Sequence, residues 1–202
     1  MFNTELIFDE VGRELLRRRG RVMTPELINQ MMGRRAVEAL QIMIDMHDLP
    51  DTVHELATET QVLFFELAAD RLAPMPGLYE LLEHIESRQL PKAVATSSSR
   101  PYMERILDQF GLLPRFDTTL TAEDVTRGKP HPEIYLAAAE RLSVTPEEML
   151  VLEDSQNGTN AAAAANAVVV SIPQEHSARH DFSNATVIAR RLDDPVILDL
   201  LS

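Results

Sequence analysis

The sequence predicts an α/β fold, with a Rossmann-like parallel-sheet core at residues 74–202 and an all-helical region at residues 1–73. Helical periodicity without a convincing strand fills the first region. In the second region, short apolar segments alternate with helical patterns, which is typical of βαβ units and a parallel sheet. The run Met149-Leu150-Val151-Leu152 is continuously apolar and bounded by turn residues. Such a run is typical of a strand buried on both faces.

The helices of the first region are predicted from apolar residues that recur at helical spacing. Ile7, Val11 and Leu15 keep this spacing up to a helix end near Gly20. Thr24-Pro25-Glu26 supplies an N-cap and a proline at the first helical position. The helical pattern continues in two later segments, at residues 36–46 and 52–72.

The second region begins at Pro74-Met75-Pro76-Gly77, where proline and glycine interrupt regular structure. The alanines at 161–165 favour a helix packed closely on the sheet, since alanine is small and a strong helix former. Strands are predicted at residues 92–96, 116–120, 149–152, 168–171 and 186–189. Helices are predicted at residues 78–88, between Ser99 and Gly111, at 132–142, at 158–166 and at the C-terminus.

Composition and charge restrict the class of partner. With 32 acidic against 19 basic residues and a net charge of −13, the chain lacks the basic face of a general nucleic-acid binder. It contains no cysteine, which excludes disulfides and thiolate zinc sites and fits a reducing cytoplasm. The sequence holds neither an apolar run of about 18 residues nor a signal-peptide pattern. We therefore expect a cytoplasmic monomer with a small-molecule substrate, and neither nucleic acid nor membrane as partner.

Two carboxylates follow the buried strand at once, at Glu153 and Asp154. Alone, such a pair is more often a solvated acidic turn. At the carboxyl end of a strand in an open α/β sheet, however, the pair would lie where ligands bind. Hard oxygen ligands at this position suit Mg²⁺ held by one or two carboxylates together with a substrate phosphate. The sequence therefore predicts Glu153 and Asp154 as metal ligands.

Two other strand ends carry residues that suit a phosphate group. Thr96, Ser97 and Ser98 follow a short strand and offer hydroxyls and backbone N–H groups at a helix start, which is a natural cradle for an anion. Lys129 lies in the loop after the next strand and could neutralise phosphate charge. Because the carboxyl ends of parallel strands share one edge, we expect these groups to meet Glu153 and Asp154 there. Together they supply what phosphoryl transfer needs.

Four motifs follow one another along the chain, at residues 76–77, 93–99, 128–135 and 151–158. Their sequences and their order resemble the haloacid dehalogenase-like (HAD) superfamily and, within it, the branch of β-phosphoglucomutases and sugar-phosphate phosphatases. The resemblance implies that the Thr96 hydroxyl contacts the phosphoryl group and that Ser97 gives a backbone donor. It also implies that Lys129 bridges the phosphate, that Glu153 and Asp154 hold Mg²⁺, and that residues 1–73 form a mobile helical cap. The motifs are Pro76-Gly77, Ala93-Val94-Ala95-Thr96-Ser97-Ser98-Ser99, Gly128-Lys129-Pro130-His131-Pro132-Glu133-Ile134-Tyr135 and Val151-Leu152-Glu153-Asp154-Ser155-Gln156-Asn157-Gly158.

The chain departs from the family in its first motif, a strand ending in Asp-x-Asp-Gly and followed shortly by Asp-Thr-Glu. Asn3-Thr4-Glu5 takes the place of Asp-Thr-Glu, so the nucleophile, the general acid/base and their strand would lie before Met1. That strand is central in the family's sheet, so we expect two strand edges to be left unpaired. We interpret the start at Met1 as an accident of start-codon assignment or of how the piece was cut.

Asp9 is the one residue that could replace the missing nucleophile, because Leu6-Ile7-Phe8-Asp9-Glu10-Val11-Gly12 superficially echoes the first motif. We reject it. Val11 stands where the acid/base should be, and the helical spacing of Ile7, Val11 and Leu15 runs through the segment.

The leading functional hypothesis is a Mg²⁺-dependent phosphoric-monoester hydrolase of small phosphorylated metabolites, with sugar phosphates as the expected substrates. Its aspartyl-phosphate nucleophile would lie upstream of this chain, so the chain alone is expected to be inactive. One alternative is a phosphomutase of the β-phosphoglucomutase type. Another is a non-enzymatic, truncated remnant that binds a phosphometabolite or a partner protein.

Two further groups of residues remain. Arg34 and Arg35 fall between cap helices, where the family places substrate-selecting residues, although a surface ion-pair role is about as frequent. His176 and His180 are four residues apart and would share a helical face. The segment around them is polar and without apolar periodicity, so we expect a loop there and no metal.

Overall fold

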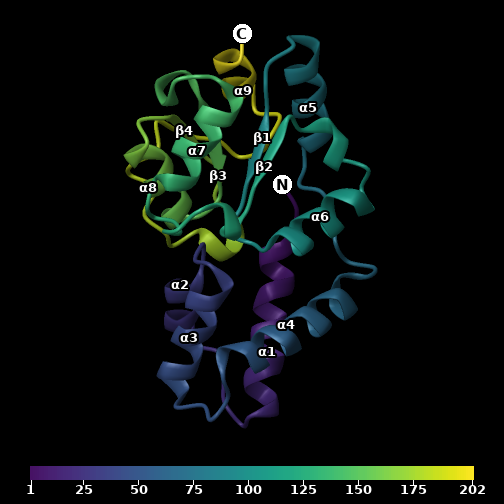
Figure 1. Cartoon of the computed structure of the whole chain (residues 1–202), viewed down its shortest axis with the longest axis vertical. Coiled ribbons are helices and arrows are strands. Elements are labelled where there is room, and N and C mark those ends of the chain that lie inside the picture. The colour runs from purple at the N-terminus through teal and green to yellow at the C-terminus, as the bar shows by residue number, and fades with distance from the viewer. The chain divides into compact units, whose positions relative to one another are not determined.

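The computed structural model describes residues 1–202 except for the side chain of His176. The chain folds as two compact units (Figure 1). The first comprises Met1–Met32 and Ala36–Met75, and the second comprises Gly33–Arg35 and Pro76–Ser202. The role of residues 1–73 as a cap over a core at 74–202 stays a prediction.

The first unit is helical, as the periodicity predicts. The helix α1 runs without interruption through Asp9 and buries Ile7, Val11 and Leu15, and the Asp9 carboxylate pairs with Arg13 at 2.8 Å. Asp9 is therefore a helical residue in an ion pair. The helices of this unit are α1 (Thr4–Arg18), α2 (Pro25–Met31), α3 (Ala36–His47) and α4 (Val53–Ala68).

The sequence signal at the start of α2 is confirmed. The Thr24 hydroxyl accepts the N–H of Leu27 at 3.2 Å and caps α2, as the Thr-Pro-Glu pattern predicts.

The last helix of this unit, α4, stops at Ala68, whereas the sequence pattern extends the helix to residue 72. The N–H groups of Arg71 and Leu72 both donate to the Ala68 carbonyl, which closes a turn and ends the helix.

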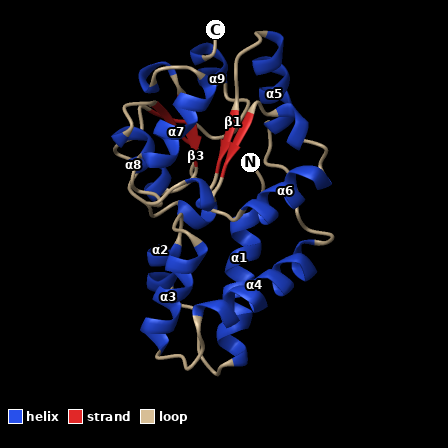
Figure 2. Cartoon of the chain, in the orientation of Figure 1, coloured by secondary structure: helices blue, strands red, loops and turns tan.

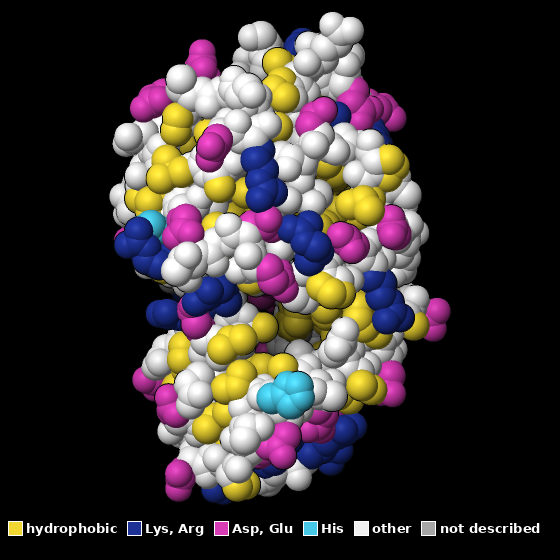
Figure 3. Space-filling model, viewed as in Figure 1, with side chains coloured by type: hydrophobic (Ala, Val, Ile, Leu, Met, Phe, Trp, Pro, Cys, Tyr) yellow, Lys and Arg dark blue, Asp and Glu magenta, His cyan; other side chains and the backbone are white. Residues whose placement is uncertain are grey.

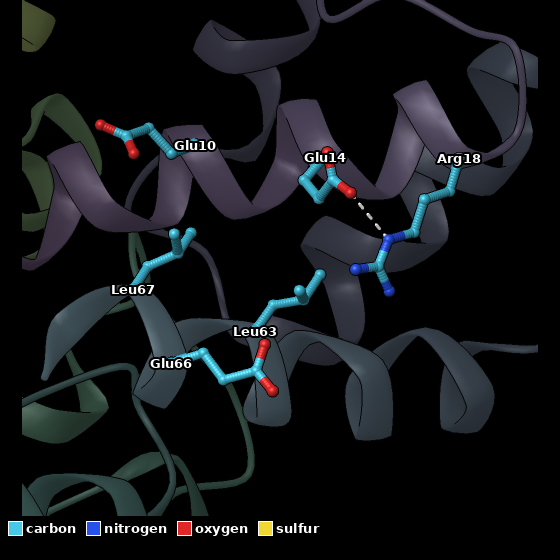
Figure 4. A pocket seen from close by; sticks show the side chains of 6 residues that line it. All are labelled: Glu10, Glu14, Arg18, Leu63, Glu66 and Leu67. Atoms are coloured by element: carbon cyan, nitrogen blue, oxygen red, sulfur yellow. Dashed lines mark hydrogen bonds and ion pairs between the residues drawn. The ribbon is translucent and has the colours of Figure 1, made fainter.

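A groove of about 350 Å³ lies between α1 and α4. Figure 4 shows Leu63 and Leu67 of α4 facing Glu10 and Glu14 of α1, with the Glu14–Arg18 ion pair at one end. The carboxylates of Glu10 and Glu14 are each paired with arginines at 2.5–2.9 Å. The arginines therefore offset the charges of Glu10 and Glu14, while Glu66 adds a further carboxylate, and the groove contains none of the residues predicted to bind phosphate.

The second unit is an α/β domain in which every strand pair is parallel (Figure 2). The predicted alternation of strands and helices is confirmed, and no predicted bound is shifted by more than two residues. The strands are β1 (Ala93–Ala95), β2 (Thr118–Leu120), β3 (Leu150–Glu153), β4 (Val168–Ser171) and β5 (Val187–Ile188). The helices are α5 (Leu78–Ser87), α6 (Arg100–Gln109), α7 (Glu133–Leu142), α8 (Gln156–Ala164) and α9 (Pro195–Leu200).

The strands form two separate ladders, with the orders β1-β2 and β3-β4-β5. In the described part of the chain, no ladder joins β1 to β3. One hydrophobic cluster nevertheless spans both ladders, because α7 packs on β1 and β2, α8 packs on β3 and β4, and the two helices contact each other. The two ladders are therefore two pieces of one layer. The buried residues of the hydrophobic cluster include Leu120 of β2, Val151 of β3, Val169 of β4, Ile134, Tyr135, Ala138 and Ala139 of α7, and Ala161 and Ala162 of α8.

The alanine-rich segment packs closely on the sheet, as its composition predicts. Ala161 and Ala162 of α8 are fully buried. Beside them, the hydroxyls of Thr159 and Ser171 lie 2.7 Å apart and satisfy each other inside the core.

On the face shown in Figure 3, basic and acidic side chains are interspersed within each unit, and neither sign of charge forms one large patch. Among the described residues, no helix has both the length and the apolarity that crossing a membrane requires.

Candidate functional site

The site is built on the turn between β3 and α8, at the carboxyl end of the sheet. Glu153 is the last residue of β3, and Ser155 is the N-cap of α8, where its hydroxyl accepts the N–H of Gly158 at 3.0 Å. The apolar run of β3 thus ends on acids because the chain reaches the open edge of the sheet there. Asp154 lies between these two residues and is partly buried.

The carboxylate of Glu153 is enclosed by donors. The Lys129 ammonium lies 2.5 Å from Oε1, and the Tyr135 hydroxyl also donates to Oε1. Oε2 accepts the N–H of Asp154 at 3.2 Å and the hydroxyl of Ser155 at 3.3 Å. The Lys129 and Glu153 side chains are only 7% and 8% exposed, so this ion pair is buried.

The surroundings shift the pKa values of this cluster in a definite direction. Burial would raise the pKa of Glu153, but the charge and hydrogen bond of Lys129, together with the hydrogen bonds from Tyr135 and the Asp154 backbone, hold that pKa below its usual range. Burial, followed by the negative charge of Glu153, raises the pKa of Tyr135 well above its usual value. At neutral pH the cluster therefore contains a carboxylate and a neutral phenol, and Tyr135 is a hydrogen-bond donor.

The ammonium of Lys129 links the ends of the two ladders. Besides Glu153 at the end of β3, it contacts the carbonyl oxygen of Ala95 at the end of β1, at 3.2 Å. An ammonium has three N–H groups, so one remains for a further acceptor such as a phosphate oxygen. The sequence predicts that Lys129 meets both strand ends, and the structure brings them together.

Some polar groups of the loop after β1 already form hydrogen bonds within the protein. The hydroxyl of Thr96 accepts the N–H of Ser98 at 3.1 Å, and the hydroxyl of Ser97 donates to the carbonyl of Gly33 at 3.2 Å. The N–H of Arg100, in the first turn of α6, is taken by Glu123 at 3.1 Å. Within the described residues, the N–H groups of Ser97 and Ser99 have no internal acceptor. They are the donors available to an anion in this loop.

Asp154 is the carboxylate that can accept a metal without losing an existing contact. Among the described residues, none is hydrogen-bonded to its side chain, in contrast to the four donors around Glu153. No group of three or more His, Asp or Glu side chains in the described part of the chain is arranged to hold a metal. The oxygens of Asp154 fit Mg²⁺ bound through one carboxylate, with the remaining ligands from substrate, water or other groups.

Arg34 and Arg35 lie on the segment Gly33–Arg35, which belongs to the second unit. Gly33 has a φ of +72°, and a Cβ at this position would lie 2.9 Å from the hydroxyl oxygen of Ser155. The guanidinium of Arg35 donates to the carbonyl of Thr126 at 3.2 Å. The structure thus brings this segment close to Ser97 and Ser155, while the substrate-binding role of the two arginines stays a prediction.

The segment that contains His176 and His180 was predicted to be a loop, and the structure differs from this prediction in one detail. Glu175–Ser177 form a single turn of 3₁₀ helix. The side chain of His176 lies outside the described residues. His180 uses Nδ1 to accept the N–H of Gln156 at 3.4 Å.

Tyr135 and Gly158 are site residues that the sequence analysis missed. Both stand in the motifs that carry the family resemblance, but neither received a role there. Tyr135 packs beneath the ammonium of Lys129, whose Nζ lies 4.9 Å from the ring centroid. A Cβ on Gly158 would lie 2.0 Å from the carboxyl group of Glu153. Tyr135 could have been found from the sequence as a tyrosine on the apolar face of a predicted helix, because a buried hydroxyl requires a hydrogen-bond partner.

Gly158→Ala is expected to lower the free energy of unfolding by about 1–3 kcal/mol, the usual cost of overpacking a filled site. Alanine in a helix is otherwise better than glycine by about 1 kcal/mol. Gly12→Ala in α1 is the matched control, because its new Cβ would meet only the terminal methyl groups of two flexible side chains, Met23 at 2.4 Å and Met43 at 3.6 Å. Urea denaturation of both variants measures the difference. If Gly158→Ala were as stable as Gly12→Ala, the close packing of Glu153 on α8 would be wrong.

Known proteins resemble this chain along most of its length. Residues 7–166 match the family model described as haloacid dehalogenase-like hydrolase. The phosphorylated carbohydrates phosphatase of Thermotoga maritima is 32% identical over 166 residues, which cover 82% of this chain and 76% of that protein. The bifunctional riboflavin kinase/FMN phosphatase of Arabidopsis thaliana is 30% identical over 195 residues, or 96% of this chain. The chain spans about half of this second relative (51%).

The fold is shared with a solved structure. The crystal structure of CbbY from Rhodobacter sphaeroides in complex with phosphate superimposes with a TM-score of 0.86 at 24% identity, covering 98% of this chain and 94% of the other. This likeness confirms the predicted Rossmann-like fold class. Since the family model matches most of the chain, the resemblance seen in its motifs is also confirmed: the chain belongs to the haloacid dehalogenase-like hydrolases.

Proposed function

We propose that this protein is a Mg²⁺-dependent phosphatase of small phosphorylated metabolites, with sugar phosphates as the main substrate class. The observation that carries the proposal is the Lys129 ammonium, which is held between the ends of β1 and β3 and retains one N–H for an acceptor. A cation, hydroxyls and a carboxylate at one sheet edge are what phosphoryl transfer needs. The Thermotoga maritima relative, named for phosphorylated carbohydrates, supports the substrate class.

Each site residue has a role in this proposal. Lys129 neutralises negative charge on the phosphoryl group, and Thr96 with the backbone of Ser97 orients its oxygens. Ser98 supports this loop by donating its N–H to the Thr96 hydroxyl. Arg34 and Arg35 contact the remainder of the substrate. Asp154 would hold Mg²⁺, which when bound offsets charge on the transferring phosphate.

The nucleophile is proposed to come from a strand that is not among these 202 residues. The interruption between the two ladders supports this, because a parallel strand placed there would end beside Lys129 and Asp154. An aspartate oxygen of that strand attacks phosphorus and the ester P–O bond breaks, while the second aspartate of the same Asp-x-Asp-Gly motif gives its proton to the leaving alcohol. Water then hydrolyses the aspartyl-phosphate and releases orthophosphate. On this proposal the chain by itself is inactive.

The test measures orthophosphate release from hexose phosphates, with Mg²⁺ and with a chelator. It compares the 202-residue chain with a version extended by the upstream genomic sequence. We expect no release by the chain alone and Mg²⁺-dependent release by the extended protein. Isomerised product without release would replace the phosphatase by a phosphomutase. An upstream sequence that lacks Asp-x-Asp-Gly, with neither protein active, would favour the non-enzymatic remnant.

A further inference from the structure

We infer that Glu153 is not a metal ligand, and that it positions Lys129 while Tyr135 holds Glu153 in place. Asp154 is then the sole metal acid of the pair. The inference deepens the proposed function and rests on it, because it assigns roles within the proposed phosphoryl-transfer site.

The first argument is the number of acceptor sites on Glu153. A carboxylate has about four lone-pair positions. Lys129 and Tyr135 occupy those of Oε1, and Ser155 and the N–H of Asp154 occupy those of Oε2. A metal at Glu153 would have to displace one of these donors. Displacing a donor from a buried carboxylate leaves a buried polar group unpaired, which is costly.

The second argument is the space around the carboxylate. The backbone of α8 is so close that a Cβ on Gly158 would lie 2.0 Å from the carboxyl carbon and 2.0–2.2 Å from its oxygens. The Tyr135 ring closes the side below Lys129. Glu153 is therefore held by protein groups, whereas none of the described residues is hydrogen-bonded to the Asp154 carboxylate.

The third argument is what the arrangement does to Lys129. A lysine side chain is flexible, and its ammonium needs fixed acceptors to stay in one position. Glu153 and the carbonyl of Ala95 take two of its N–H groups. The remaining N–H is thereby restricted in direction, so it can meet a phosphate oxygen without further ordering. Tyr135 contributes by holding Oε1 of Glu153.

The test is a binding experiment on the 202-residue chain, independent of turnover. Mn²⁺, a spectroscopic substitute for Mg²⁺ with the same preference for oxygen ligands, is titrated by electron paramagnetic resonance. Inorganic phosphate is titrated by calorimetry. The variants are Asp154→Asn, Tyr135→Phe and the double variant Lys129→Met/Glu153→Gln. The double variant removes a cation and an anion together, so the net charge near the metal is unchanged.

We expect Asp154→Asn to weaken Mn²⁺ binding by at least about tenfold, a typical loss for a changed metal site. The double variant and Tyr135→Phe should keep the Mn²⁺ dissociation constant within about threefold, less than one lost hydrogen bond would cost. Both should weaken phosphate binding, Tyr135→Phe by about three- to tenfold through loss of one hydrogen bond. If Glu153 had only a structural role, these variants would not weaken phosphate binding while leaving Mn²⁺ binding nearly unchanged.

The inference is overturned if the double variant loses Mn²⁺ binding as strongly as Asp154→Asn, or if the unaltered chain binds no Mn²⁺. Should the double variant fail to fold, Tyr135→Phe decides, because it preserves every charge. Weakened Mn²⁺ binding with unchanged phosphate binding in Tyr135→Phe also contradicts the inference. These outcomes are separate from the proposed function, whose failure would appear as absent orthophosphate release by the extended protein.

Discussion

Lys129→Met is expected to lower the free energy of unfolding by about 3–5 kcal/mol, the usual cost of leaving a buried charge without its partner. The Glu153 carboxylate would remain inside the protein, 8% exposed, with only the neutral donors of Tyr135, Ser155 and the backbone. The loss is measured by urea denaturation at neutral pH.

Lys92→Met is the matched control, since it removes the same side chain from another Lys–Glu pair. The ammonium of Lys92 lies 3.5 Å from Glu86, whose side chain is 37% exposed. Water screens such a pair, so the expected loss is below about 1 kcal/mol. Equal losses in the two variants would contradict the buried character of the Lys129–Glu153 pair.

The double variant Lys129→Met/Glu153→Gln tests whether the loss comes from the pair. Removing both charges leaves no uncompensated ion, so the double variant should be more stable than the sum of the single losses implies. Residues in direct contact usually show such coupling, of about 0.5–3 kcal/mol. Additive losses would mean that each side chain stabilises the fold separately.

The elements of the fold were largely predictable because they follow from local patterns. The helical spacing of Ile7, Val11 and Leu15 requires nothing beyond one helix and one buried face. The run before Glu153 marks a strand by itself, although only Val151 among the apolar residues of β3 is fully buried, while Leu150 and Leu152 are partly buried. The ends of α4 and the short β1 were less predictable, because they depend on hydrogen bonds with residues outside the pattern.

The site was predictable in its members but not in their contacts. Thr96, Lys129, Glu153 and Asp154 follow from the rule that parallel strands end at one edge. The hydroxyl of Tyr135 reaches Glu153 at the end of β3 because α7, which packs on β1 and β2, also contacts α8, and this placement follows from long-range contacts. The closeness of Gly158 to Glu153 similarly depends on how α8 is seated on the sheet. From the sequence, Glu153 and Asp154 are therefore predicted to have the same role. In the structure their surroundings differ.

The largest effect on turnover is expected from Asp154→Ala in the protein that carries the nucleophile. We expect the rate constant for orthophosphate release at saturating substrate to fall by about 10²–10³, the usual cost of losing one electrostatic partner of a transition state. The reason is that the Asp154 side chain, directly after β3, is the proposed metal ligand, so its loss would leave the charge of the transferring phosphate uncompensated. Raising Mg²⁺ should restore part of the rate if the metal can still bind through its other ligands.

Lys129→Ala should give a loss of similar size that added Mg²⁺ does not restore, because this cation belongs to the protein. Asp199→Ala is the control, since Asp199 is exposed on α9, and it should leave the rate constant unchanged. Measurements with a chelator and over a range of Mg²⁺ concentrations separate the two site variants. Near-normal turnover of Asp154→Ala at saturating substrate and Mg²⁺ would remove Asp154 from the metal site. The same result for Lys129→Ala would remove the ammonium from catalysis and leave it as one half of a structural ion pair with Glu153.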